Sequence, residues 1–281
     1  MAIGDSTRVN TNIAAFNALK ALKNINLNLA KSQLKLATGL RINEVSDDPA
    51  GFVISKRLIA RSKGLSVALD NVGTAKNVLS IAEGGLLSIS DIVLRMKELV
   101  TQAASDTLGT DERAAIKSEI TELTSEIDDI VSETQFNSIA LIDGTYTAIS
   151  FQSGEGTTDT LTVSISQSHT AASLVVAAAN VANQASSSAL AVSALTNVNA
   201  ALDTINTSLQ NIGATISRLS IKENTLSIAI TNTEATKSRI LDVDIAREQL
   251  ESTRFQILQQ TATAQLAQAN VIPQNVLALF T

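Results

Sequence analysis

The sequence predicts a mainly α-helical, elongated protein in which antiparallel coiled-coil helices form a bundle that carries a small β-hairpin. The helices at the two chain ends are expected to pair with each other. Three observations predict this fold: heptad repeats of apolar residues in three segments, one segment with strand-like alternation, and amphipathic stretches at both ends. With no Trp, one Tyr and six Phe in 281 residues, the core must be mostly aliphatic.

The longest heptad pattern extends from Leu65 to Ala103. Apolar residues occupy both seam positions in six consecutive heptads: Leu65, Val72, Leu79, Leu86, Val93 and Val100, and three residues after each Ala68, Ala75, Ala82, Ile89, Met96 and Ala103. At 1.5 Å per residue this helix is roughly 58 Å long, which is more than a compact domain usually accommodates. The pattern therefore predicts an extended helical unit.

Two further helices are expected to pack against the first. After a break at residues 109–111, which offer turn and capping residues, the same spacing recurs in Ile116, Ile120, Leu123, Ile127 and Ile130. A third series begins at Leu195 and reaches Ile230, with Glu223 at one seam position, and predicts a helix of at least 35 residues.

One region has the period of a strand. Apolar and polar residues alternate around Phe151 and again around Val163, with a glycine-containing turn between them. This pattern predicts a β-hairpin over about residues 147–167, the only strand-like region of the chain. Residues 171–194 are weakly patterned, and both helix and loop remain open there.

Both chain ends have amphipathic stretches without internal Gly or Pro up to Gly39 and Pro273, which predicts continuous helices of about 25 residues. Each carries apolar residues seven apart that need a partner, so the simplest arrangement pairs the two ends. The stripe residues are Ala15, Leu22, Leu29 and Leu36 near the N-terminus and Leu250, Ile257, Ala264 and Val271 near the C-terminus.

Two acidic motifs have structural explanations. Asp48 precedes Pro49, a favoured first residue of a helix, so its carboxylate is expected to cap that helix rather than to catalyse a reaction. Asp242 and Asp244 lack the glycine and the distal Glu of a calcium loop, and are expected to be solvated or to cap a helix. The glycosylation sequon Asn206-Thr207-Ser208 lies inside the third heptad series and is interpreted as a chance match.

Composition argues against enzymatic and nucleic-acid-binding functions. The formal charge is −6, and the basic residues are scattered, so nucleic acid is not an expected partner. There is no Cys, and the single histidine, His169, is expected to be an ordinary surface residue, so neither a metal site nor a catalytic triad is predicted. No phosphate-binding loop, signal peptide or membrane-spanning run is recognised, and no cofactor is expected.

Motifs at both ends of the chain resemble those of bacterial flagellins, in the same order. They are Asn10-Thr11-Asn12-Ile13-Ala14-Ala15, Thr38-Gly39-Leu40-Arg41-Ile42-Asn43, Asp47-Asp48-Pro49-Ala50-Gly51, Gln135-Phe136-Asn137, Ser238-Arg239-Ile240-Leu241-Asp242-Val243-Asp244-Ile245-Ala246, Ala267-Gln268-Ala269-Asn270 and Pro273-Gln274-Asn275-Val276-Leu277. The resemblance covers roughly residues 8–143 and 195–280, and about 50 residues separate the two blocks.

The resemblance implies a minimal flagellin with two domains, called D0 and D1 in the family. Residues 1–45 are expected to form the N-terminal D0 helix and a connecting segment, and residues 236–281 the C-terminal D0 helix. The D1 domain is expected to combine N-terminal helices over 46–143, the β-hairpin over 144–170 and a C-terminal helix over 171–235. The D0 stripes are then expected to contact other subunits.

The same resemblance implies a structural, non-enzymatic subunit that polymerises into the flagellar filament for swimming motility. The expected partners are copies of the chain, the flagellar cap, hook-filament junction proteins, an export chaperone and the flagellar export apparatus, with no membrane partner. The expected location is extracellular, after secretion. Two alternatives stay open: a hook-filament junction protein, and a secreted coiled-coil adhesin.

A recognition patch for a vertebrate Toll-like receptor is also implied by the family. Its motif matches Arg95 and Leu99 in the first heptad helix and Glu119 in the second. Because Arg95 and Leu99 are four residues apart on a helix that must contact neighbouring subunits, assembly is an alternative explanation of these residues.

Overall fold

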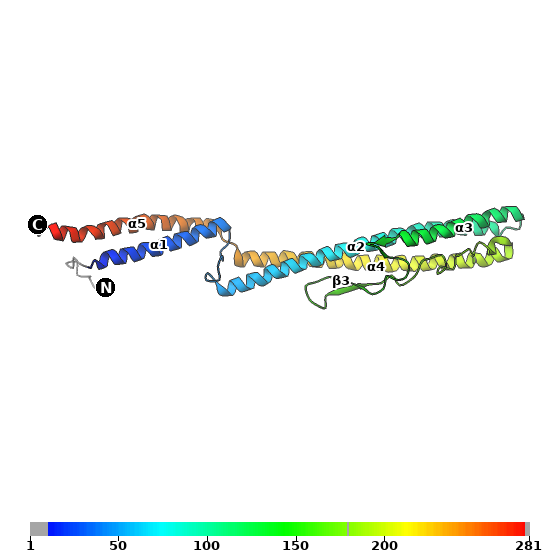
Figure 1. Ribbon diagram of the computed structural model, residues 1–281, viewed down its shortest axis with the longest axis horizontal. Coiled ribbons are helices and arrows are strands. Elements are labelled where there is room, and N and C mark those ends of the chain that lie inside the picture. The colour runs from blue at the N-terminus through cyan, green and yellow to red at the C-terminus, as the bar shows by residue number, and fades with distance from the viewer. Residues whose placement is uncertain (1–10, 179, 279–281) are drawn as a thin grey trace. The chain divides into compact units, whose positions relative to one another are not determined.

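The computed structural model describes residues 11–178 and 180–278, which divide into two compact units (Figure 1). Unit 1 combines the described parts of Met1–Ala60 and Asn232–Thr281, and unit 2 is Arg61–Thr231. The mainly helical fold predicted from the heptad patterns is confirmed.

Unit 1 is built on an antiparallel pair of helices from the two chain ends, α1 (Ile13–Thr38) and α5 (Ile245–Ala278) (Figure 1). The Asn12 side chain caps α1 by accepting the Ala15 N–H at 2.9 Å. The helix ends at Gly39, whose φ of 70° is the left-handed conformation that terminates helices. α5 continues past Pro273, so the expected stop at this proline is wrong.

Unit 2 contains most of α2 (Pro49–Ala103) and α4 (Ser188–Leu241), together with all of α3 (Thr110–Glu133). All twelve seam residues predicted between Leu65 and Ala103 are buried. Ile120 and Ile127 of α3 and Val198, Ile205 and Leu219 of α4 complete the same aliphatic core. The charge at the interrupted seam position is neutralised, because the Lys76 Nζ atom lies 2.7 Å from a carboxylate oxygen of Glu223.

Two antiparallel strand pairs flank these helices. β3 (Ile149–Gln152) pairs with β4 (Thr160–Val163), as the alternation predicted, and the Asn71 side-chain amide donates to the Gln152 carbonyl at 3.1 Å. This hairpin is not the only strand pair, because β1 (Gln135–Phe136) pairs with β2 (Ile139–Ala140) directly after α3. Two-residue strands have too short an alternation to be recognised in a sequence.

The segment left open between the hairpin and the third helix is mostly turns. One 3₁₀ turn, η1 (Gln184–Ser186), precedes α4, which begins at Ser188. Small apolar side chains such as Ala171, Val176 and Val181 are fully buried and attach this segment to the core. Burial of these residues, rather than a helical repeat, orders the segment.

Among the helices that the structure describes, one, α2, has the length and composition of a membrane span, with a mean hydropathy of 1.4 over 18 residues. Heptad analysis had not recognised such a run. The apolar seam of α2 forms the core of unit 2 with α3 and α4. A long helix buried in a protein core has the same length and hydropathy as a helix that spans a membrane.

His169 is completely buried, so its assignment as a surface residue is wrong. Its ring contacts the Ile142 carbonyl through Nδ1 at 3.2 Å and the Ser208 hydroxyl through Nε2 at 2.8 Å. A neutral ring satisfies both contacts by donating from Nδ1 and accepting at Nε2. Burial lowers the pKa of His169 below its ordinary value of 6.5.

We predict that protonation of His169 opposes folding. The unfolded chain takes up this proton near pH 6.5, whereas the folded protein resists it, so stability is full above pH 6.5 and is lost as the pH falls towards the lowered folded pKa. The thermal midpoint, followed by circular dichroism between pH 8 and 5.5, should fall in the native chain and vary less in His169→Gln. An equal pH dependence in both proteins would contradict this explanation.

Candidate assembly surfaces

The α1–α5 pair is held together by hydrogen bonds and by small residues that let the two helix backbones approach closely. Among the side chains that the structure describes, three hydrogen bonds join the two segments: Asn12 Nδ2 to the Ala269 carbonyl at 2.7 Å, Gln259 Nε2 to Asn26 Oδ1 at 2.8 Å, and Ser32 Oγ to the Glu248 carbonyl at 3.3 Å. The buried residues of the pair are mostly small: Leu29, Ser32, Ser252, Ala262 and Ala269. Small residues let the two backbones approach closely, but they bury little apolar surface.

The two terminal stripes lie in different surroundings. In α1, Leu29 is buried and Ala15, Leu22 and Leu36 are half-buried. In α5 the predicted residues point away from the pair: Leu250 is 73% exposed, Ile257 59% and Val271 41%, and Ala264 is also exposed. The heptad spacing identified both stripes, but it could not tell which side of α5 faces α1.

A second set of apolar residues lies on the uncovered side of α1. Phe16 is 71% exposed, and Ile13, Leu19, Leu27 and Leu34 are between 43% and 55% exposed. Together with the α5 stripe, they place many large apolar side chains of unit 1 at its surface. Exposed apolar surface of this extent marks a site of protein association.

The connections that lead into and out of this helix pair are joined to each other. The Arg41 N–H donates to the Leu241 carbonyl at 2.6 Å, and the Val243 N–H donates to the Gly39 carbonyl at 3.0 Å. The Arg41 guanidinium adds a bond to the Ile240 carbonyl at 2.7 Å. These backbone contacts fix the point at which both chain segments leave the α1–α5 pair.

The acidic residues of these connections act as helix caps and loop anchors. Asp48 Oδ1 accepts the Gly51 N–H at 3.0 Å and so caps α2, as predicted, and Asp244 Oδ1 caps α5 by accepting the Arg247 N–H at 3.1 Å. Asp47 Oδ2 accepts the N–H groups of Asn43 and Glu44. The bond from Glu44 is the main reason why the pKa of Asp47 is lowered.

The receptor patch implied by the resemblance is only partly at the surface. Arg95 and Glu119 are exposed and form an ion pair of 2.8 Å, and Arg95 also pairs with Glu98 at 3.0 Å. Leu99 is only 3% exposed because it packs in the core of unit 2. Leu99 was therefore wrongly placed in a surface patch.

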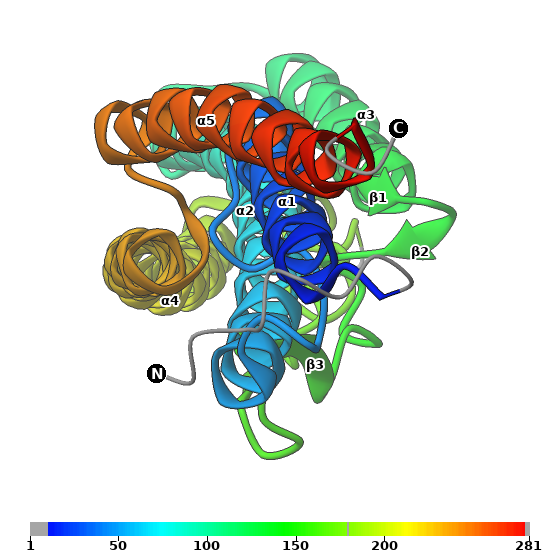
Figure 2. The same ribbon diagram turned by 90° about the vertical axis from the view of Figure 1, so that its left-hand side faces the viewer.

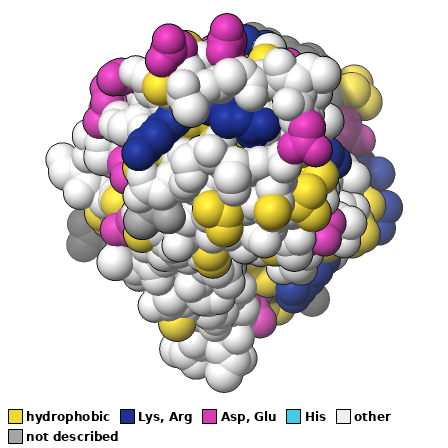
Figure 3. Space-filling model, turned by 90° about the vertical axis from the view of Figure 1, so that its right-hand side faces the viewer, with side chains coloured by type: hydrophobic (Ala, Val, Ile, Leu, Met, Phe, Trp, Pro, Cys, Tyr) yellow, Lys and Arg dark blue, Asp and Glu magenta, His cyan; other side chains and the backbone are white. Residues whose placement is uncertain are grey.

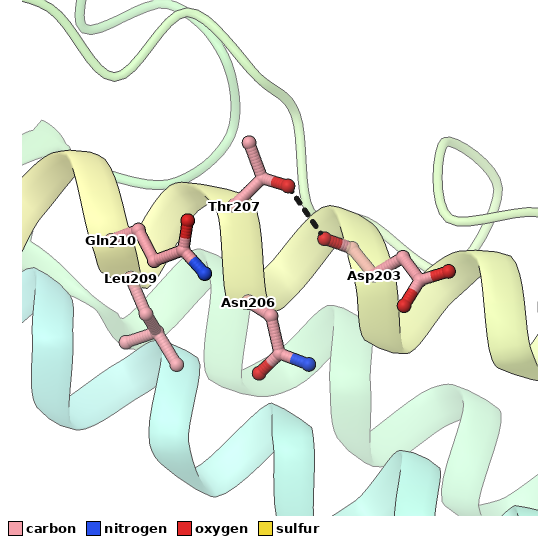
Figure 4. Close-up of a pocket in the computed structure, with 5 residues that line it drawn as sticks. All are labelled: Asp203, Asn206, Thr207, Leu209 and Gln210. Atoms are coloured by element: carbon pink, nitrogen blue, oxygen red, sulfur yellow. Dashed lines mark hydrogen bonds between the residues drawn. The ribbon is translucent and has the colours of Figure 1, made fainter.

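A polar hollow on α4 offers no chemistry of its own. Figure 4 shows its lining by Asp203, Asn206, Thr207, Leu209 and Gln210, in which the Thr207 hydroxyl donates to the Asp203 backbone carbonyl at 2.8 Å. Ser208, which follows Thr207, is buried and contacts Nε2 of His169. The two residues do not form part of a catalytic triad, because Nδ1 of His169 faces the Ile142 backbone carbonyl instead of a carboxylate. Over residues 11–178 and 180–278, no three His, Cys, Asp or Glu side chains are grouped as metal ligands.

Paired terminal helices with their large apolar residues outside define a structural subunit that associates with other copies. Two family models match the chain: the bacterial flagellin N-terminal helical region over residues 9–147 and the C-terminal helical region over 195–280. The chain belongs to the bacterial flagellin family. It is a subunit of the flagellar filament and not an enzyme.

Relatives along the whole chain agree with this assignment. The flagellins of Halalkalibacterium halodurans and Bacillus subtilis are both 36% identical, over 97% of this chain and 99% of each relative. A solved structure of a putative flagellar hook-associated protein from Vibrio parahaemolyticus has a TM-score of 0.60 and covers 70% of this chain and 100% of its own. At 15% identity it shows the fold alone, and the junction-protein alternative is not favoured.

We predict that Gly51→Ala weakens the start of α2. A Cβ atom at this position would lie 2.4 Å from Asp48 Oδ2 and 2.7 Å from Ile42 Cδ1, so both the cap and the buried Ile42 must move. The expected loss is about 1–3 kcal/mol, seen as faster amide hydrogen exchange in the first turns of α2.

Gly84→Ala is the matched control within the same helix. A Cβ atom at position 84 meets nothing within 4 Å, so this change should stabilise α2 locally by up to about 1 kcal/mol. Equal protection of the first turns of α2 in Gly51→Ala and in the native protein would contradict the proposed crowding.

Proposed function

We propose that the exposed apolar residues of unit 1 are the contacts that polymerise this flagellin. The supporting observation is that the α5 stripe of Leu250, Ile257, Ala264 and Val271 has no partner within the described chain although it has the spacing of a coiled-coil seam. Burial of such surface yields roughly 25 cal/mol per Å², which one subunit does not gain alone. Copies that cover each other's stripes gain it.

The D0 and D1 division follows from this role. Residues 1–45 supply the N-terminal D0 helix and a connecting segment, and residues 236–281 supply the C-terminal D0 helix, so that these helices line the inner tube of the filament. Residues 46–143, 144–170 and 171–235 supply the helices and hairpin of D1 around it. The difference in core composition supports this division: the seam of α2 is apolar throughout, whereas the residues buried between α1 and α5 are mostly small and include two serines.

Order in the terminal helices then depends on assembly. The α1–α5 pair buries few large side chains, and helices in proteins gain most of their stability from tertiary packing of an apolar face. The ends of a free subunit are therefore disordered and fold as they join the filament. A chain with unfolded ends can pass through a narrow export channel.

The remaining partners follow from the resemblance to the family. The flagellar export apparatus reads the N-terminal region, a chaperone covers the C-terminal apolar stripe before export, and the subunit is added outside the cell beneath the cap. Hook-filament junction proteins contact the first subunits. The exposed α5 stripe supports the chaperone contact, because an uncovered apolar helix face invites aggregation.

We predict that Leu250→Ser with Ile257→Ser abolishes polymerisation while unit 2 stays folded. Both side chains are mostly exposed in the subunit, so little folding energy is lost, whereas an assembly contact loses two large apolar groups. Purified protein would be mixed with sheared filament seeds, and filament growth would be followed by sedimentation and negative-stain electron microscopy.

Val192→Ser is the control, because this residue is 58% exposed on α4 in unit 2. This variant should polymerise at the same protein concentration as the native chain. Normal filaments from the α5 double variant would refute the stripe as an assembly contact, although the chain would remain a filament subunit. A native protein that does not extend seeds would instead contradict polymerisation itself.

A further inference from the structure

The acidic charge of unit 2 is concentrated in α3, which carries eight acidic and two basic residues. Figure 3 shows Asp and Glu side chains near the upper edge of the molecule, with Lys and Arg side chains below them. Near the end of the helix, Glu126, Asp129 and Glu133 share one exposed side, and none of them has an ion-pair partner in the described part of the chain. This group faces solvent without a cation.

This arrangement costs the helix stability. Acidic residues three and four positions apart repel one another, and negative charge in the last turns of a helix opposes the helix dipole. α3 has no basic residue in its last turn. A cationic surface docked here would relieve both unfavourable interactions.

Two exposed apolar side chains follow the end of α3 in the chain. The β1–β2 turn follows α3 and leaves Phe136 37% exposed and Ile139 49% exposed. Between them, Asn137 and Ser138 adopt φ of 50° and 63°, a conformation that L residues rarely adopt. Ser138 occupies the position at which glycine is usual in such a turn. We call Glu126, Asp129, Glu133, Phe136 and Ile139 the acidic face.

A surface of opposite charge and similar apolar content lies on α4. Ile221 is 65% exposed and Ile228 is 62% exposed, the highest values among the large apolar residues described in unit 2. Arg218 lies one turn before Ile221, and Lys222 follows it. Neither cation has an ion-pair partner among the described residues. We call these four residues the basic face.

The two faces lie on different flanks of unit 2. Figure 2 shows α3 with β1 and β2 to one side of α2 and α4 to the other. One subunit can therefore offer its acidic face to one neighbour and its basic face to another. Contacts between unlike faces that do not close on themselves produce an open series of subunits.

We propose that the acidic face of one subunit binds the basic face of a second copy in the filament. This inference rests on polymerisation of the chain and names a contact in unit 2, separate from the terminal stripes. Charge complementarity selects the partner: each face has two exposed apolar side chains and charges of one sign, and the two signs are opposite. Association covers the apolar groups and neutralises the repelling carboxylates of α3.

The test reverses the charges of each face in the full-length chain. The acidic-face variant carries Glu126→Lys, Asp129→Lys and Glu133→Lys, and the basic-face variant carries Arg218→Glu and Lys222→Glu. A control with Asp91→Lys, Asp106→Lys and Asp203→Lys makes the same change of charge as the acidic-face variant, at exposed positions outside both faces. Critical concentrations for growth from native seeds and monomer thermal midpoints would be measured for each.

We expect each face variant to need at least about tenfold more protein to polymerise than the control, because like charges then meet across the contact. The acidic-face variant should not lose thermal stability, since lysines in the last turns of α3 interact favourably with the helix dipole, unlike the native carboxylates. An equimolar mixture of the two face variants, or one chain carrying both reversals, should recover polymerisation, because opposite charges meet again.

Polymerisation of either face variant at the control's critical concentration would overturn the proposal. So would a mixture and a combined chain that assemble no better than the single-face variants, because the two faces would then not bind each other. Failure of the native chain to extend seeds is a different result, which contradicts filament formation as a whole.

Discussion

The structure depends on one constraint, the burial of an unbroken aliphatic seam along α2. Its heptads place a large or small apolar residue on the same side of the helix at every turn from Leu65 to Ala103, and none of these residues remains exposed. α3 and α4 fold back along this seam, and the hairpin is attached to it through Asn71. With almost no aromatic side chains, the core gains its stability from length rather than from a few large anchors.

Unit 1, in contrast, buries little apolar surface between its helices. Its helices meet through Ser32, Ser252, Ala262 and Ala269, with hydrogen bonds from Asn12, Ser32 and Gln259, so the pair is close and specific but buries little apolar area. The large apolar residues remain outside. In a subunit of a helical polymer, this distribution reserves apolar surface for association. The free energy of burying these residues is gained only when another copy covers them. Unit 2 then folds by itself, whereas the proposed ordering of unit 1 is coupled to assembly.

Sequence reasoning succeeded where one local rule decides the structure. The heptads predicted the three helices of unit 2, Asp48 with Pro49 predicted the start of α2, and alternation predicted the β3–β4 hairpin. It failed where the outcome depends on tertiary contacts. Periodicity shows that α5 has an apolar side, but only the fold shows that small residues take the side facing α1 and leave Leu250 outside. His169 and Leu99 were misplaced for the same reason, since burial of a single residue has no periodic signal.

The two units also differ in the kind of contact they offer to a neighbour. Apolar stripes on long helices are weakly selective, because a coiled-coil seam can slide by one heptad and still be covered. Fixed charges are more selective: in the proposed contact, a displaced subunit would separate the carboxylates of Glu126, Asp129 and Glu133 from the cations of Arg218 and Lys222. In the proposed assembly the two surfaces have different roles, since the stripes of unit 1 supply the driving force and the charged contact in unit 2 sets the register between copies.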